Sequence, residues 1–163
     1  KIIPAFSNGL YFTDDNTGYA YTSGDSLSKT LDGGAHWQAF SKVSSLGHIE
    51  IDMYNVLQFT DPLHGWMMDE SSLSATSDGG PHWTMLYSPA SRPNLTYFTD
   101  FQMLNDQSGY LATPQMILRT NDGGLNWEEN YTATDVQIIS IDFLDEHHGW
   151  AGCRNGMVLR YLR

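Results

Sequence analysis

Hydrophobic residues in this chain occur in short runs, each bounded by residues that form turns. No segment keeps an apolar period of about 3.6 residues for long enough to indicate a helix, so the pattern predicts an essentially helix-free protein. The clearest example is the segment in which Asp61, Pro62 and Gly65 interrupt the apolar residues. Strands are expected there over residues 56–60, 66–69, 73–76 and 83–87.

One octapeptide pattern, T-x-D-G-G-x-[H/N]-W, occurs three times, and we call each copy a box. The boxes read TLDGGAHW from Thr30, TSDGGPHW from Thr76 and TNDGGLNW from Thr120, so their starts are 46 and 44 residues apart. Recurrence with such a period is typical of propellers, solenoids and other repeat architectures.

A second pattern, [F/M]-x-[D/N]-x-x-x-G-[Y/W], precedes each box. Its four copies start at Phe12, Phe59, Met103 and Phe143. No box follows the fourth copy. The segment GMVLRYLR aligns with QMILRT before the third box, which places Tyr161 at the position of Thr120.

Four units of this kind, over about residues 7–47, 48–92, 93–132 and 133–163, have the dimensions of four-stranded propeller blades. We therefore expect a single all-β domain over residues 1–163, a β-propeller of four antiparallel blades. The last unit lacks its outer strand, and residues 1–6 (KIIPAF) are expected to supply that strand and close the ring. Pro4 is acceptable there because the strand is a sheet edge. A larger ring completed by two chains, and hence a homodimer, is the alternative.

The box contains the residues that a hairpin turn needs. Its Asp can accept hydrogen bonds from nearby amides, its glycines can adopt positive φ, its Thr can bond across the loop, and its Trp can cover the turn. A phosphate-binding loop is not expected, because a strand follows each box and no box contains Lys. The residues expected to hold these turns are Thr30, Asp32, Gly33, Gly34, Trp37, Thr76, Asp78, Gly79, Gly80, Trp83, Thr120, Asp122, Gly123, Gly124 and Trp127.

The amino-acid composition limits the classes of molecule that this chain is expected to bind. The net charge of −11 argues against binding of nucleic acid and of anionic membranes, and leaves a basic protein or a neutral glycan open. No apolar run reaches the ~20 residues of a membrane span. The lone Cys153 permits no intrachain disulfide and is expected in the core. Because the chain begins with Lys1 and not Met, we expect a processed form or an excised piece, from which any export signal has been removed.

The box resembles the Asp-box, or BNR, repeat of sialidases and related propellers. Together with the second pattern, it is most similar to the photosystem II assembly and stability factor propellers and their bacterial relatives. The resemblance extends from about Phe12 to Arg160. It implies a β-propeller whose boxes stabilise the blade periphery, an extracytoplasmic location (secreted, periplasmic or lumenal), and a non-catalytic role in binding another protein. Those relatives usually have more than four blades.

Enzymatic chemistry is not favoured by the residues. A sialidase needs an arginine cluster and an Arg-Ile-Pro signature, and the segment SRPN from Ser91 does not provide one. A glycosidase needs two facing carboxylates, but the box aspartates and their counterparts in the second pattern are expected to hold turns. His147 and His148, beside Asp145, are awkward as metal ligands because neighbouring residues of a strand point to opposite faces. We therefore expect no catalytic residue, no cofactor and no metal.

Binding is expected where the units differ, in the connections 41–50 and 88–95. Ser91, Arg92 and Pro93 form the candidate loop for a protein partner. The leading hypothesis is a non-catalytic scaffold that binds another protein. The alternatives are a carbohydrate-binding or glycoside-processing propeller of a secreted protein, and a structural module of a longer chain.

Overall fold

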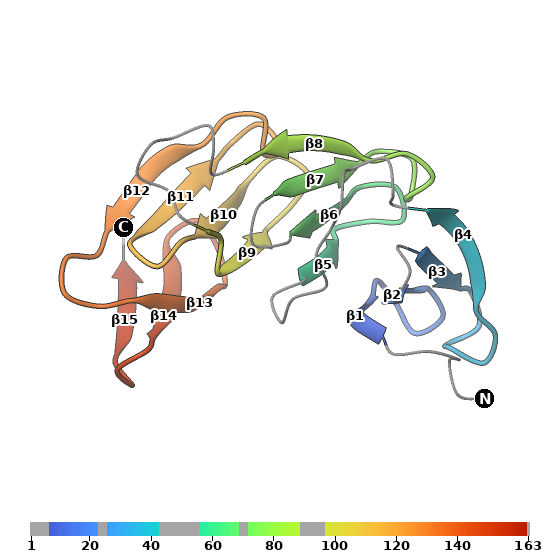
Figure 1. Ribbon diagram of the computed structural model, residues 1–163, viewed down its shortest axis with the longest axis horizontal. Coiled ribbons are helices and arrows are strands. Elements are labelled where there is room, and N and C mark those ends of the chain that lie inside the picture. Colours follow the sequence, from blue (N-terminus) through green and yellow to red (C-terminus); the bar gives the residue numbers. More distant parts are fainter. Residues whose placement is uncertain (1–6, 23–25, 43–55, 69–71, 89–96, 163) are drawn as a thin grey trace. The chain divides into compact units, whose positions relative to one another are not determined.

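The structure, a computed structural model, describes residues 7–22, 26–42, 56–68, 72–88 and 97–162 (Figure 1). Every regular element within these ranges is a strand, which confirms the predicted all-β architecture. The expected closing strand, residues 1–6, lies outside the described residues. In the part of the chain that the structure describes, no helix has the length and apolar character needed to cross a membrane.

The strands form four antiparallel sheets, each built from strands that are consecutive in sequence. Sheet 1 contains β1 (Ser7–Phe12), β2 (Gly18–Thr22), β3 (Ser26–Thr30) and β4 (Gln38–Lys42). Sheet 2 contains β5 (Val56–Phe59), β6 (Gly65–Met68), β7 (Leu73–Thr76) and β8 (Thr84–Tyr87). These four strands lie within one or two residues of the strands predicted for this segment.

The remaining strands follow the same order. Sheet 3 contains β9 (Asp100–Met103), β10 (Gly109–Ala112), β11 (Met116–Thr120) and β12 (Glu128–Thr132). Sheet 4 contains β13 (Ile138–Phe143), β14 (His148–Cys153) and β15 (Val158–Leu162). Among the described residues, sheet 4 has three strands where each other sheet has four.

Two compact units divide the chain. Unit 1 consists of residues 1–69 and 73–85 and contains sheet 1 and nearly all of sheet 2, and unit 2 consists of residues 70–72 and 86–163 and contains sheets 3 and 4. Each unit therefore pairs two successive repeats.

All four sheets share one register, set by the second sequence pattern. In sheet 1, Phe12 of β1 lies opposite Gly18 of β2, and Gly18 lies opposite Thr30 of β3. Equivalent residues pair in the other sheets, with Met103 at the Phe position of sheet 3 and Tyr161 at the Thr position of sheet 4. Glycine is required because the aromatic ring covers it: a Cβ on Gly18 would lie 2.7 Å from the Phe12 ring.

An aromatic pair joins the two sheets of unit 1. Tyr19 stacks on Phe59 with ring centroids 3.7 Å apart and an interplanar angle of 10°. Its hydroxyl donates a 3.1 Å hydrogen bond to the carbonyl of Pro62, in the turn that follows Phe59. Trp83 meets Phe59 edge-on at 6.2 Å. The rest of this buried cluster is Leu27, Leu57 and Met67.

The same arrangement joins the two sheets of unit 2. Tyr110 stacks on Phe143 with centroids 3.6 Å apart and an interplanar angle of 5°. Its hydroxyl donates to the carbonyl of Glu146 at 3.2 Å, at the position equivalent to Pro62. Cys153 is buried in this cluster, as predicted. Its other buried members are Ala112, Ile117, Ala133, Ile138, Ile141 and Ala151.

Candidate functional site

The three boxes have one hydrogen-bonding geometry, which begins with a buried threonine. In the second box, the Thr76 hydroxyl donates to Asp78 Oδ1 at 2.8 Å and accepts the amide N–H of Gly80 at 2.9 Å. The first and third boxes make the same two bonds at 2.8–3.0 Å. The hydroxyl therefore links the start of the turn to its second glycine in every box.

The aspartate of each box binds the residue four positions later. Asp78 Oδ1 accepts the backbone N–H of His82 at 3.1 Å, and Asp78 Oδ2 lies 2.6 Å from His82 Nδ1. His36 does the same in the first box, and Asn126 uses its side-chain amide in the third. The recurrence of His or Asn at this position is thus explained by one shared hydrogen bond.

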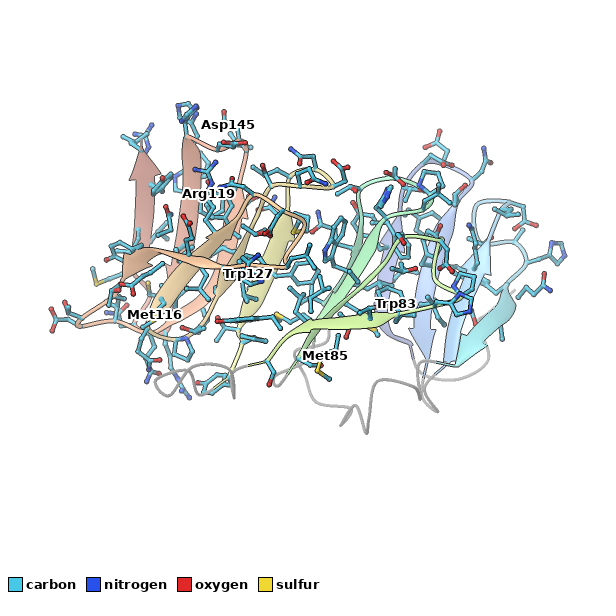
Figure 2. All side chains as sticks on the ribbon, turned by 90° about the horizontal axis from the view of Figure 1, so that it is seen from above. Trp83, Met85, Met116, Arg119, Trp127 and Asp145 are labelled. Carbon is cyan, nitrogen blue, oxygen red and sulfur yellow. The ribbon has the colours of Figure 1, made fainter. Side chains whose placement is uncertain are left out.

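The glycines and the tryptophan complete the turn. Both glycines have positive φ in every box, for example 77° at Gly79 and 108° at Gly80. The indole Nε1–H of Trp83 donates to the carbonyl of Gly80 at 2.8 Å, and Trp37 and Trp127 make the equivalent bond at 3.0 Å. Figure 2 labels Trp83 and Trp127. Each Trp therefore lies directly before the outer strand and is bonded to the turn through its indole N–H.

The second sequence pattern forms another recurrent turn, which binds to the box. Asp61 Oδ1 accepts the amides of Leu63 and His64 at 2.7 and 2.9 Å, and Asp14, Asn105 and Asp145 bind their turns in the same way. The first glycine of the box then donates to this turn, as Gly79 does to the Leu63 carbonyl at 2.8 Å. The two patterns are therefore a single bonded unit within each of the first three sheets.

These contacts lower the pKa of the turn aspartates. The His82 side chain is the main reason that the pKa of Asp78 falls to about 2, and the His36 backbone amide is the main reason that the pKa of Asp32 falls to about 2. The pKa of the other turn aspartates, Asp14, Asp61, Asp122 and Asp145, is lowered for similar reasons. A carboxylate held in this way is a poor proton donor at neutral pH.

Asp100 is the opposite case. Burial raises its pKa, although the carboxylate accepts the amides of Phe101 and Ile141 at 2.8 Å. Because Ile141 belongs to β13, this contact ties sheet 3 to sheet 4, and Gln102 makes a second tie by exchanging two hydrogen bonds with the Phe143 backbone. The Asp100 carboxylate therefore holds the two sheets of unit 2 together.

Unit 2 also contains a contact between two charged side chains. Arg119 of β11 pairs with Glu146, which also accepts a hydrogen bond from the Ser108 hydroxyl at 3.2 Å. Arg119 is mostly buried. Sequence reasoning missed this pair, because its two residues belong to different repeats and neither lies in a box. In the described residues, no group of three or more His, Cys, Asp or Glu side chains is placed to hold a metal ion.

Unit 1 has a groove of about 450 Å³ between the first two boxes. Its apolar lining comes from Leu31, Trp37 and Pro81, and its charged lining from Lys29, Asp32 and Asp78. Leu31 is 71% exposed. Box residues therefore contribute to a surface as well as to their turns. The candidate loop of Ser91, Arg92 and Pro93 lies outside the described residues.

With this geometry established, comparisons with known proteins identify the family. The model of the family described as photosynthesis system II assembly factor YCF48 matches residues 42–134, more than half of the chain. The chain therefore belongs to this family, a class of BNR-type β-propellers. A search of proteins with curated descriptions gave no match.

Solved structures share the fold. YCF48 bound to a D1 peptide is 20% identical with a TM-score of 0.64, and the match covers 97% of this chain and 66% of that one. YCF48 from Cyanidioschyzon merolae is 15% identical with a TM-score of 0.70, covering 94% of this chain and 50% of that one. The GH74 enzyme of Niastella koreensis is 13% identical with a TM-score of 0.68, covering 96% and 28%. The chain thus spans half to two thirds of the length of these YCF48 chains.

Replacing Thr76 with Val is expected to lower the free energy of unfolding by about 1 to 3 kcal/mol, because the buried Gly80 amide loses its acceptor while the side-chain shape is kept. Urea unfolding measures the change. Thr84→Val, at an exposed position on the neighbouring strand, is the control and should have little effect. Equal destabilisation by the two variants would contradict the role assigned to the hydroxyl.

Stability is expected to decrease as the pH falls from about 4 to about 2. A carboxylate with a lower pKa in the folded chain than its ordinary 3.8 stabilises the fold above that ordinary value, and the contribution is lost as the pH falls through the folded pKa. The urea midpoint should follow this course, with a shallower decrease in the double variant Asp32→Asn/Asp78→Asn. The same slope in both proteins would show that these two aspartates do not contribute.

Proposed function

We propose that this protein is a non-catalytic propeller that binds a segment of another protein. The observation that carries the proposal is membership of the YCF48 family, in which one solved relative is described as bound to a D1 peptide. The environment of the acidic residues supports it. The carboxylates of the three box aspartates and of Asp100 are engaged in turns or between sheets, where their oxygens accept backbone amides.

The groove of unit 1 is the surface that we assign to this binding. It combines exposed apolar atoms of Leu31 and Trp37 with the carboxylates of Asp32 and Asp78, in a protein of net charge −11. Such a surface suits a segment that carries an apolar side chain next to Lys or Arg. We also propose an extracytoplasmic location, by analogy with the family.

Carbohydrate binding is the competing function, because GH74 enzymes share the fold and the groove presents an indole ring beside carboxylates. The two functions make different demands on the ligand. A peptide is selected for its cationic charge, whereas a neutral sugar is not, so the effect of salt separates them.

The test is selection from a random peptide library that includes peptides of D1, with an oligosaccharide array in parallel. We expect peptides with a basic residue next to an apolar one, and binding that weakens with salt. Leu31→Asp should reduce this binding at least about tenfold. Leu125→Asp is the matched control, because Leu125, in the third box, is similarly exposed and is not among the residues that line the groove.

Two results would contradict the proposal: no peptide enriched above background, or binding of oligosaccharides without binding of peptides. Peptide binding that the two leucine variants reduce equally would overturn the assignment of the groove.

A further inference from the structure

The lining of the groove in unit 1 contains a histidine beside three charged residues. The charged and titratable residues of this lining are Lys29, Asp32, His36 and Asp78. Histidine is the side chain that ordinarily changes its charge between about pH 5 and pH 8, whereas carboxylates and amines ordinarily titrate outside that interval. A change of charge in the groove near neutral pH is therefore expected at His36.

The two carboxylates of the groove keep their charge over the same interval. The backbone amide of His36 is the main reason that the pKa of Asp32 is lowered to about 2, and the side chain of His82 is the main reason that the pKa of Asp78 is lowered to about 2. Both carboxylates are therefore ionised throughout the interval in which histidine titrates. A change in binding over that interval would not come from either aspartate.

The contact between His36 and Asp32 determines where an added proton is bound. His36 Nδ1 lies 2.6 Å from Asp32 Oδ2. Because an ionised carboxylate can only accept a hydrogen bond, Nδ1 must donate, and Nε2 is the nitrogen that can take up a second proton. The His36 side chain is 77% exposed, so water can reach it. Protonation therefore adds a charge to the groove without breaking the hydrogen bond that holds the box.

The third box shows that this geometry does not require an imidazole. Asn126 donates its backbone N–H to Asp122 Oδ1 at 2.9 Å and its side-chain amide to Asp122 Oδ2 at 2.8 Å. His36 makes the equivalent two contacts with Asp32 at 2.8 and 2.6 Å. Asparagine thus satisfies the box aspartate as histidine does, and the property that histidine adds is a charge that depends on pH.

Protonation of His36 changes the net charge of the groove. One lysine and two aspartates give the lining a net charge of −1 while His36 is neutral, and a protonated His36 brings it to zero. A cationic ligand is then repelled by the imidazolium at the same distance at which the carboxylates attract it. The apolar contacts with Leu31 and Trp37 do not depend on this charge. Acidification is therefore expected to weaken the electrostatic part of binding alone.

Two neighbouring elements of unit 1 carry further charged groups. The turn bonded to the first box contains Asp15 and also Asp14, whose pKa is lowered mainly by the backbone amide of Asn16. The second box contains His82, whose Nδ1 lies 2.6 Å from Oδ2 of the groove residue Asp78. His82 is not among the residues that line the groove, but its protonation would act in the same direction, so it needs a variant of its own.

We propose that His36 makes binding by the groove of unit 1 depend on pH: a cationic peptide segment binds while the imidazole is neutral and binds more weakly once it is protonated. This inference rests on the proposed protein-binding function and adds the condition under which the groove binds.

The probe is the capped peptide acetyl-GLKLKG-amide, which places apolar side chains next to lysines and has no histidine or carboxylate. Titration of the ¹⁵N-labelled 163-residue chain at constant ionic strength gives the Kd from the shifts of the Leu31 and Gln38 amides, which belong to the groove. The Kd should rise at least about threefold between about pH 8 and pH 5.5. The neutral peptide acetyl-GLQLQG-amide should show no such rise.

His36→Asn is the variant that separates charge from structure, because the third box already has asparagine at this position. It should bind the lysine peptide at about pH 8 within about twofold of the unchanged chain, and most of the pH dependence should be lost. His82→Asn is the matched control in the second box and should keep most of the dependence. The measurement on the unchanged chain needs no variant, so it holds even if a variant does not fold.

Three results would overturn the proposal and leave the proposed function intact: the same Kd at both pH values, an equal rise for the neutral peptide, and an undiminished pH dependence in His36→Asn. A fourth result, no shift of groove amides by either peptide at about 10 mM and about pH 8, would contradict the assignment of the groove itself, and the present inference with it.

Discussion

The structure depends on satisfying one amide in each box, which is buried in the second and third boxes and part-buried in the first. The N–H of Gly80 and of its equivalents is turned inward by the positive φ of two successive glycines, and it must find an acceptor away from water. The threonine hydroxyl supplies that acceptor and donates its own hydrogen bond to the aspartate. The turn then delivers a tryptophan, fixed by its indole N–H, to the start of the outer strand. In unit 1 this tryptophan, Trp83, is part of the buried aromatic cluster.

The hydrogen bonds that the three boxes share serve the fold, and they occupy polar groups that could otherwise act in catalysis. An aspartate that contacts a threonine, an amide and a histidine at once has little left to offer as a general acid or base, although its charge can still attract a cation. The groove that we propose for binding is lined by residues of the first two boxes.

Much of the fold could be predicted from the sequence because the signals are local. Turn residues bound each short apolar run, so the strands of sheet 2 were placed to within one or two residues. The shared bond of His36, His82 and Asn126 also followed from their common position. The stacking of Tyr19 on Phe59 could not be predicted, because it joins different repeats and depends on how two sheets pack. The aromatic residue that follows the recurrent glycine was visible in the sequence, but the sequence does not specify which ring it stacks on.

The candidate sites could not be predicted either, because they depend on contacts between residues that are distant in sequence. The groove of unit 1 and the Arg119–Glu146 pair each bring together residues that are distant in sequence. The loop of Ser91, Arg92 and Pro93 and the closing strand over residues 1–6 remain predictions.

Amide hydrogen exchange at the second glycine of the box tests the central claim most directly. If the threonine bond braces the hairpin, the N–H of Gly80 should exchange only through large-scale unfolding, with a protection factor many times that of the exposed Ser77 in the same box. Exchange of Gly80 as fast as that of Ser77 would show that the bond opens freely, and would contradict the claim that the box is a structural brace.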